Sequence, residues 1–207
     1  PLLFKTGVIL SSSAVILFVP NIVNAGSSDF YFNRAYEKGE NGDYYGAISD
    51  YTKAIEIEPN DSMAYYNRGI SKRKLKDNYG AISDYTKAIE INTSFHYAYY
   101  NRGNAKSDIR DYYGAISDYT KAIEINSQYS KAYNNRGYTK SKIKDFYGAI
   151  SDYTKAIEIN PKYALAYTNR SESKENIGDI IGACADAKKA FSLGDEDANK
   201  SWIKENC

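Results

Sequence analysis

The stretch Tyr-Gly-Ala-Ile-Ser-Asp-Tyr-Thr-Lys-Ala-Ile-Glu-Ile occupies residues 45–57, and the same thirteen residues return unchanged at 79–91, 113–125 and 147–159. A degraded copy lies at residues 181–193, so each copy begins 34 residues after the one before it. A fixed period of this length is typical of stacked supersecondary units that share no single central core. Such arrays usually bind other molecules and seldom catalyse reactions, so the repeat favours a binding function.

One repeat, residues 96–129, predicts two helices. Tyr99 and Gly103 lie on one face of a first helix, and Tyr119 lies on the apolar face of a second. Asp111 stands between them, where its side chain can cap the second helix. A hairpin this small cannot bury its apolar stripe alone, so we expect neighbouring hairpins to stack.

Small and aromatic residues recur in phase through the sequence. The small residues are Ala35, Gly69, Gly103, Gly137 and Ser171 on the first helix, and Ala47, Ala81, Ala115, Ala149 and Ala183 on the second. The aromatic residues include Tyr31, Tyr65, Tyr99, Tyr133 and Tyr167. This spacing resembles the tetratricopeptide repeat family over residues 28–197, about four fifths of the sequence. The resemblance implies an all-α fold, a right-handed α-solenoid of five helix-turn-helix repeats at residues 28–61, 62–95, 96–129, 130–163 and 164–197.

Residues 195–207 predict one more amphipathic helix, of which residues 198–207 form a C-terminal cap with Trp202 and Ile203 on its apolar side. Cys184 lies ten residues before Gly194 and Cys207 lies thirteen after it. If the last two helices fold back antiparallel, the helical rise of about 1.5 Å per residue brings both sulfurs to a similar level. We therefore predict a disulfide between Cys184 and Cys207; two free thiols are the alternative.

A glycine near the start of each second helix departs from the expected helix composition. These residues are Gly46, Gly80, Gly114, Gly148 and Gly182. Glycine inside a helix costs up to about 1 kcal/mol relative to alanine. Either each glycine allows a neighbouring helix to come close, or the column has no structural role.

Residues 1–25 lie outside the repeats. Lys5 precedes an apolar run at residues 8–19, and Val23 and Ala25 offer small residues suited to signal peptidase. The run is shorter than the roughly 20 residues that a spanning helix needs. We predict a signal peptide, cleaved after Ala25, and export to a periplasm or a compartment like the thylakoid lumen. The alternative is an uncleaved membrane anchor.

The composition argues against several classes of function. The protein has 27 basic and 26 acidic residues, a formal charge of +1, so it lacks the excess of basic charge that nucleic-acid binding needs. No phosphate-binding glycine motif or metal-ligand spacing is present, and His96 has no Cys or Ser partner at a catalytic spacing. We therefore expect no cofactor, no metal and no enzymatic activity.

The differences between repeats lie mainly in the first helix, because the second helix barely changes. One stripe of the first helix lies half a turn from the packing face, and in the resembled family it lines a concave groove that binds peptides. An asparagine recurs at one position of this stripe in every repeat. This asparagine column is Asn33, Asn67, Asn101, Asn135 and Asn169. We add Met63, Tyr97, Tyr100, Asn104 and Tyr138 as groove residues that vary between repeats.

Two interpretations of the column stay open. The amide of asparagine offers both a donor and an acceptor, so the column can pair with the backbone of an extended polypeptide. It resembles the asparagine ladder of O-linked N-acetylglucosamine transferases. Alternatively, each asparagine bonds within the array or faces water.

The arginine that follows each asparagine recurs in phase with an aspartate of the second helix, and we interpret these residues as structural charge pairs.

The sequence thus predicts a non-enzymatic scaffold whose partner is a protein or peptide, acting in the assembly or maintenance of envelope or membrane complexes. The alternative is a structural adaptor that docks folded partners, or associates with itself, through its outer surface. Binding of a carbohydrate, or an enzymatic reaction, in the groove is a third and weaker hypothesis.

Overall fold

The computed structural model describes residues 26–195 and 200–207, and within these ranges every regular element is an α-helix. The predicted signal peptide at residues 1–25 lies outside the described residues. The first helices of the five hairpins are α1 (Ser28–Glu40), α3 (Ser62–Lys74), α5 (His96–Asp108), α7 (Ser130–Lys142) and α9 (Ala164–Asn176). The second helices are α2 (Tyr44–Ile57), α4 (Asn78–Ile91), α6 (Tyr112–Ile125), α8 (Phe146–Ile159) and α10 (Ile180–Ser192). The helix α11 (Lys200–Asn206) follows them.

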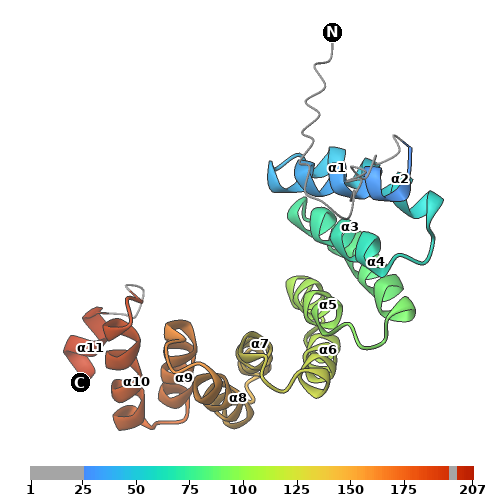
Figure 1. The fold of residues 1–207 in the computed structure, drawn as a ribbon. Helices are drawn as coiled ribbons and strands as arrows, with labels where there is room; N and C mark the ends of the chain where they lie inside the picture. Colours follow the sequence, from blue (N-terminus) through green and yellow to red (C-terminus); the bar gives the residue numbers. More distant parts are fainter. Residues whose placement is uncertain (1–25, 196–199) are drawn as a thin grey trace, which may run out of the picture.

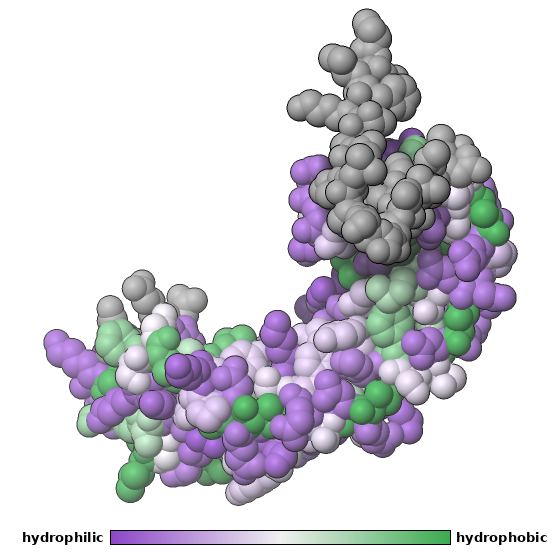
Figure 2. All heavy atoms as spheres, in the orientation of Figure 1, coloured by the Kyte–Doolittle hydropathy of each residue, from purple (hydrophilic) through white to green (hydrophobic). Residues whose placement is uncertain are grey.

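The hairpins stack in sequence order, and each first helix after α1 packs against both its own second helix and the second helix before it. Figure 1 shows the result, a crescent in which α3, α5 and α7 line the inner side and their second helices lie behind them. Figure 2 shows the same view hollowed between the two arms, with hydrophilic and hydrophobic residues mixed over the surface. The predicted all-helical solenoid is confirmed.

The core is a row of small clusters between hairpins, built from alanines and tyrosines. Tyr85, Tyr119 and Tyr153 of the second helices are at most 1 % exposed. Each ring lies against the glycine of its own first helix, and a Cβ added to Gly103 would stand 2.8 Å from Tyr119 Cε1. In the second, third and fourth repeats the glycine is therefore required by an aromatic ring, because the ring fills the space a side chain would need.

Replacing Gly103 by alanine should lower the free energy of unfolding by about 1–3 kcal/mol, because the buried Tyr119 ring has little room to move. Gly39 is the matched control: it also lies in a first helix, but the nearest atom to an added Cβ is Ala47 Cβ at 3.9 Å. Gly39→Ala should therefore stabilise by about 0.5–1 kcal/mol through helix propensity. Urea unfolding followed by circular dichroism measures both; equal effects of the two substitutions would contradict this account.

An aspartate caps the start of every second helix, as predicted for Asp111, whose carboxylate accepts a hydrogen bond from Gly114 N at 3.0 Å. A Cβ added to Gly114 would lie only 2.2 Å from Asp111 Oδ2. The same geometry holds at Gly46, Gly80, Gly148 and Gly182. The atoms nearest each added Cβ belong to the capping aspartate, so these glycines make room for the capping carboxylate, a role that neither sequence interpretation named.

The arginine–aspartate pairs form a repeated ion-pair network, which confirms their structural interpretation. In the third repeat, Arg102 donates from Nε and Nη2 to Asp118 at 2.9 and 2.7 Å, and Lys106 Nζ lies 2.9 Å from the same carboxylate. Arg102 Nη1 also donates to Thr86 of the preceding repeat at 3.0 Å. The network therefore ties each hairpin both to itself and to the hairpin before it. Its members at the other repeats are Arg34–Asp50, Arg68–Asp84, Arg136–Asp152 and Arg170–Asp186.

In the first repeat, the hydrogen bonds from Arg34 lower the pKa of Asp50 from 3.8 to about 2. A folded-state pKa below the unfolded value stabilises the protein above the unfolded pKa, and the stabilisation is lost as the pH falls towards the folded pKa. We expect Asp50 to contribute up to about 2 kcal/mol that disappears between about pH 4 and pH 2. Urea unfolding across this range measures the loss, and Asp50→Asn should reduce it; an unchanged pH dependence in that variant would disprove the assignment.

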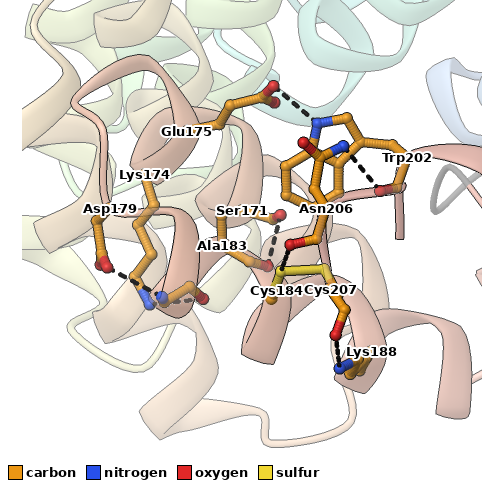
Figure 3. The surroundings of a disulfide bond; sticks show 11 residues. Ser171, Lys174, Glu175, Asp179, Ala183, Cys184, Lys188, Trp202, Asn206 and Cys207 are labelled. Carbon is orange, nitrogen blue, oxygen red and sulfur yellow. Dashed lines mark hydrogen bonds between the residues drawn. A yellow bond between two sulfur atoms is a disulfide. The ribbon is translucent and has the colours of Figure 1, made fainter. Parts of the chain in front are cut away.

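The C-terminal end of the array is covered by α11, which lies within the helix predicted for residues 195–207; residues 196–199 lie outside the described residues. Cys184 of α10 and Cys207 form a disulfide with a Cα–Cα distance of 5.5 Å. Figure 3 shows the surrounding contacts: Trp202 Nε1 donates to Glu175 Oε1 at 2.8 Å, and Lys188 Nζ donates to the carbonyl oxygen of Cys207 at 3.2 Å. The cap therefore contacts both helices of the last hairpin.

Candidate binding groove

Two cavities lie side by side on the inner helices. The α5–α7 cavity, of about 280 Å³, is lined by Arg73, Asn104, Ser107, Asp108, Tyr119, Asn134, Asn135, Tyr138, Leu165 and Asn169. The α3–α5 cavity, of about 380 Å³, is lined by Tyr66, Ile70, Arg73, Lys74, Lys76, Tyr85, Asn101 and Asp108. Together they form a candidate groove along the concave side, over the second to fifth repeats.

An ion pair separates the two cavities. Arg73 Nη2 lies 2.9 Å from Asp108 Oδ2, and both residues line both cavities. The side chains are 35 % and 43 % exposed, so the pair is half open to solvent and contributes at most about 1 kcal/mol. A ligand that spans the groove must pass over this pair or replace it.

Four of the five residues of the asparagine column, all but Asn33, are bonded within the array. Asn101 Nδ2 donates to the Tyr66 hydroxyl at 2.9 Å and to its own helix at Tyr97 O. Asn135 Nδ2 donates to the hydroxyl of Tyr100 at 3.0 Å and to Asn104 Oδ1 at 2.9 Å. Asn67 and Asn169 each donate one amide hydrogen, to Met63 O and Asn134 Oδ1 respectively. Asn101, Asn135 and Asn169 thus join adjacent first helices. Both amide hydrogens of Asn101 and of Asn135 are engaged, so these donors reach a partner's backbone only if one of these bonds breaks, whereas Asn67 and Asn169 each keep one amide hydrogen without an internal partner.

We therefore expect Asn135→Ala to cost about 1–2 kcal/mol of stability, because it removes two hydrogen bonds that join α5 to α7. Asn33→Ala is the matched control, since the side chain of Asn33 is exposed and forms no hydrogen bond with a described residue. Thermal or urea unfolding of both variants checks the difference. Equal stability of the two variants would show that the column is not part of the scaffold.

The other predicted groove residues lie in three different environments. Tyr138 and Asn104 line the α5–α7 cavity, and Tyr138 is 43 % exposed. Tyr100 is half-buried, its ring 4.9 Å from that of Tyr129, and it lines neither cavity. Met63 and Tyr97 are 45 % and 47 % exposed but lie outside both cavities, as do Asn33 and Asn67.

Sequence reasoning omitted several lining residues from the predicted site. Asp108, Ile70 and Lys74 share the stripe of the asparagine column, so the helical period places them on the predicted groove stripe although they are not among the named site residues. Arg73 lies one residue from that stripe, and Lys76 lies in the turn after α3. Three tyrosines reach the cavities from the packing side: Tyr66, Tyr85 and Tyr119. No periodic signal identifies this last group, because its position depends on how the hairpins stack.

Burial raises the pKa of the tyrosines around the groove. The pKa of Tyr66 rises to about 12, and the pKa of Tyr100 is also raised by burial. These phenols therefore keep their protons at neutral pH and act as hydrogen-bonding groups. Burial likewise raises the pKa of the Glu172 carboxyl on α9.

Metal sites and membrane spans are the other functional features relevant to the described part of the protein. No cluster of three or more His, Cys, Asp or Glu side chains that could hold a metal ion occurs among these residues. Within the same residues, none of the helices has the length and apolar character needed to cross a membrane. Desolvation lowers the pKa of His96, whose ring packs against Tyr97 and Tyr129.

Solved structures resemble the array over all or part of its length. The sequence is 27 % identical to that of the protein in "Crystal structure of MamA protein". The TM-score of the two structures is 0.75, and the match covers 84 % of this sequence and 94 % of that one. It is 20 % identical to "Crystal structure of YrrB: a TPR protein with an unusual peptide-binding site", with a TM-score of 0.73 and coverage of 87 % and 94 %. It is 25 % identical to "First TPR of Spaghetti (RPAP3) bound to HSP90 peptide SRMEEVD", with a TM-score of 0.55 and coverage of 56 % and 92 %.

Comparison with curated proteins finds no match. Tetratricopeptide repeat models match residues 28–61, 50–82, 96–129 and 130–163, which together make up more than half of the sequence. The matched ranges at 28–61, 96–129 and 130–163 coincide with three of the predicted repeats. Together with the stacked hairpins, these matches show that the protein belongs to the tetratricopeptide repeat family, whose members are typically scaffolds for protein–protein interaction.

Proposed function

We propose that this protein is a non-enzymatic scaffold that holds an extended segment of a partner protein in its concave groove. The α5–α7 cavity carries the proposal, because it is concave, mixes amide and apolar groups, and lies on the inner helices. Its lining differs from repeat to repeat: Asn104 and Tyr138 occupy equivalent positions on α5 and α7. A groove that varies along a uniform scaffold can select one sequence of a bound segment.

A structural relative supports a peptide ligand, since the RPAP3 repeat domain in the comparison is bound to a peptide. Because both amide hydrogens of Asn101 and of Asn135 are engaged within the array, recognition in this protein rests mainly on other side chains, such as Tyr138 and Leu165, which are 43 % and 49 % exposed. Along the stripe, Lys74, Lys131 and Lys142 are offset by Glu40, Asp108 and Glu172. Binding along the whole groove should therefore depend only modestly on salt.

The test is a selection of random linear peptides on residues 26–207, followed by affinity measurements on the selected peptides. Tyr138→Ala should weaken binding by about tenfold or more, as the loss of a groove aromatic does at a binding hot spot. Tyr113→Ala is the matched control, since Tyr113 is 76 % exposed and lies on a second helix. Loss of binding in the Tyr113 variant alone would place the peptide site outside the groove.

The second candidate is docking of a folded partner, or self-association, through the outer tyrosines. Four tyrosines at the start of the second helices are 74–77 % exposed: Tyr45, Tyr79, Tyr113 and Tyr147. These four tyrosines are regularly spaced, and they expose large apolar side chains to solvent. A change of elution volume on gel filtration with concentration, abolished by Tyr79→Ser and Tyr113→Ser together, would favour self-association over the peptide groove.

We further propose that the protein is exported and serves the assembly or maintenance of envelope or membrane complexes. The support is the apolar run at residues 8–19 followed by Val23 and Ala25. Mass spectrometry of the protein from its native cells should find Gly26 at the N-terminus. A protein that keeps residues 8–19 and partitions into membrane would indicate the anchor instead.

A further inference from the structure

One ion pair departs from the pattern of the repeats. Arg73 contacts Asp108 Oδ2 through both Nε and Nη2, each at 2.9 Å, and this is the only ion pair among the described residues that joins two hairpins. The other ion pairs of the described residues each lie within one hairpin. At the other junctions the same two positions hold Gly39 and Lys74, Ser107 and Lys142, or Ser141 and Asn176, which form no ion pair. Those hairpins stack without such a contact, so stacking does not explain the pair.

The pair lies where the two cavities of the groove meet. Arg73 is on α3 and Asp108 is the last residue of α5, and these helices are neighbours on the inner side of the crescent (Figure 1). Both residues line both cavities, so the closed pair stands between the α3–α5 and α5–α7 cavities. Both side chains are partly exposed, and exposed ion pairs contribute little to stability. The pair can therefore open at small cost, and opening makes the two cavities continuous.

A peptide group has the chemistry to replace the pair. Arg73 offers only hydrogen-bond donors, and the carboxylate of Asp108 offers only acceptors. A peptide group carries one C=O acceptor and one N–H donor, so a single group inserted between the two side chains satisfies both. Hydrogen bonds to ionised groups are stronger than those between neutral groups. An apolar group at the same place would leave two charges without partners, which is unfavourable.

We propose that the ion pair between Arg73 and Asp108 is a gate of the groove: it divides the groove in the free protein and opens around one peptide group of a bound segment. Arg73 then donates to the C=O of that group, and Asp108 accepts from its N–H. The proposal rests on the proposed function, because the peptide group belongs to the bound partner segment. It adds a restriction on that segment: a proline, which has no N–H, is disfavoured at the position that crosses the gate.

The first test compares two uncharged probes by NMR titration of ¹⁵N-labelled protein, residues 26–207. N-acetyl-hexaglycine dimethylamide carries an N–H at every residue, whereas N-acetyl-hexasarcosine dimethylamide keeps the carbonyls and has a methyl group on each of these nitrogens. Hexaglycine should shift the Arg73 Nε–H signal and the backbone amides of Arg73 and Asp108. Hexasarcosine should bind at least about tenfold more weakly, the size expected for one lost hydrogen bond to a charged group.

The variant Asp108→Ala separates the gate from a general preference for glycine. Without the carboxylate no group of the gate accepts the N–H, so the preference for hexaglycine over hexasarcosine should shrink to about twofold or less. Absence of shifts with hexaglycine in the wild type would overturn the proposal. A preference as large in Asp108→Ala as in the wild type would overturn it as well.

The second test is the dependence of hexaglycine binding on salt. Salt weakens the exposed ion pair, and the uncharged probe has no charge to be screened. Raising NaCl from about 20 mM to about 500 mM should therefore increase the affinity by about two- to fivefold, the range that an exposed pair allows. The Arg73→Gln, Asp108→Asn double variant, which has no ion pair, is the matched control and should show no increase. An affinity that stays constant or falls with salt in the wild type would contradict a gate.

The stability of the double variant checks for a structural role. Because the pair is partly exposed and is absent from the other junctions, Arg73→Gln, Asp108→Asn should unfold at nearly the same urea concentration as the wild type. A clearly lower midpoint would show that the pair holds the second and third repeats together, and the gate would be wrong.

The gate and the groove function can fail separately. If selected peptides bind in a manner that depends on Tyr138 but hexaglycine shows no dependence on Asp108, only the gate is wrong. If hexaglycine binds in a manner that depends on Asp108 but no peptide is selected, the gate stands and the selective groove is wrong.

Discussion

Asp118→Ala should lower the free energy of unfolding by about 3–5 kcal/mol, the largest loss expected from any substitution proposed for this protein. Asp118 is 3 % exposed, and its carboxylate accepts from Arg102 at 2.7 and 2.9 Å and pairs with Lys106 at 2.9 Å. Removal of the carboxylate leaves two cations together, only 16 % and 21 % exposed, with no anion between them. The loss therefore includes an uncompensated charge as well as the missing bonds.

Urea unfolding followed by far-ultraviolet circular dichroism measures the effect. Glu124→Ala is the matched control, because Glu124 pairs with Lys121 on the same helix but both side chains are more than half exposed. An exposed pair of this kind is worth at most about 1 kcal/mol. Because Arg102 also bonds Thr86, the Asp118 variant should in addition unfold less cooperatively, as coupling between adjacent repeats weakens. A loss no larger than that of Glu124→Ala would show that the buried network does not stabilise the array.

Removal of the disulfide is expected to cost about 2–4 kcal/mol, since it closes a segment with a sequence separation of 23. The effect should fall on the cap first, because α11 makes few contacts with α10 beyond the bridge. Trp202 is the only tryptophan of the protein and lies on α11, so its fluorescence reports the cap separately from the rest. In the reduced protein, the Trp202 transition should occur at lower urea than the circular dichroism transition.

The Cys184→Ser, Cys207→Ser double variant should behave like the reduced wild type and should not respond to reductant. Coincident fluorescence and circular dichroism transitions in both the oxidised and the reduced protein would contradict this prediction. They would mean that the cap and the last hairpin unfold as one unit without the bridge. In that case the contact from Trp202 to Glu175 would be enough to hold α11.

Much of the fold was determined by sequence alone, because it depends on periodicity within single hairpins. The repeat of 34 residues sets the number and phase of the helices, and the matched family models begin at the predicted boundaries of three repeats. The capping role of Asp111 and the pairing of Arg102 with Asp118 also follow from helix geometry, since both partners belong to one hairpin. The positions of the glycines near the start of the second helices were also evident from the sequence. The reason for them was not, because it depends on the exact distance between each glycine and the capping carboxylate.

The state of the groove was decided by the tertiary structure. Sequence placed Asn101 and Asn135 on the inner stripe, but it could not show that Tyr66 and Tyr100 of the preceding repeats accept their amide hydrogens. The pair of Arg73 with Asp108 is likewise a feature of the junction between two hairpins. The physical reason is that a helical period fixes the direction of each side chain on its own helix, whereas contacts between repeats depend on the stacking of neighbouring hairpins and on which rotamers fit between them.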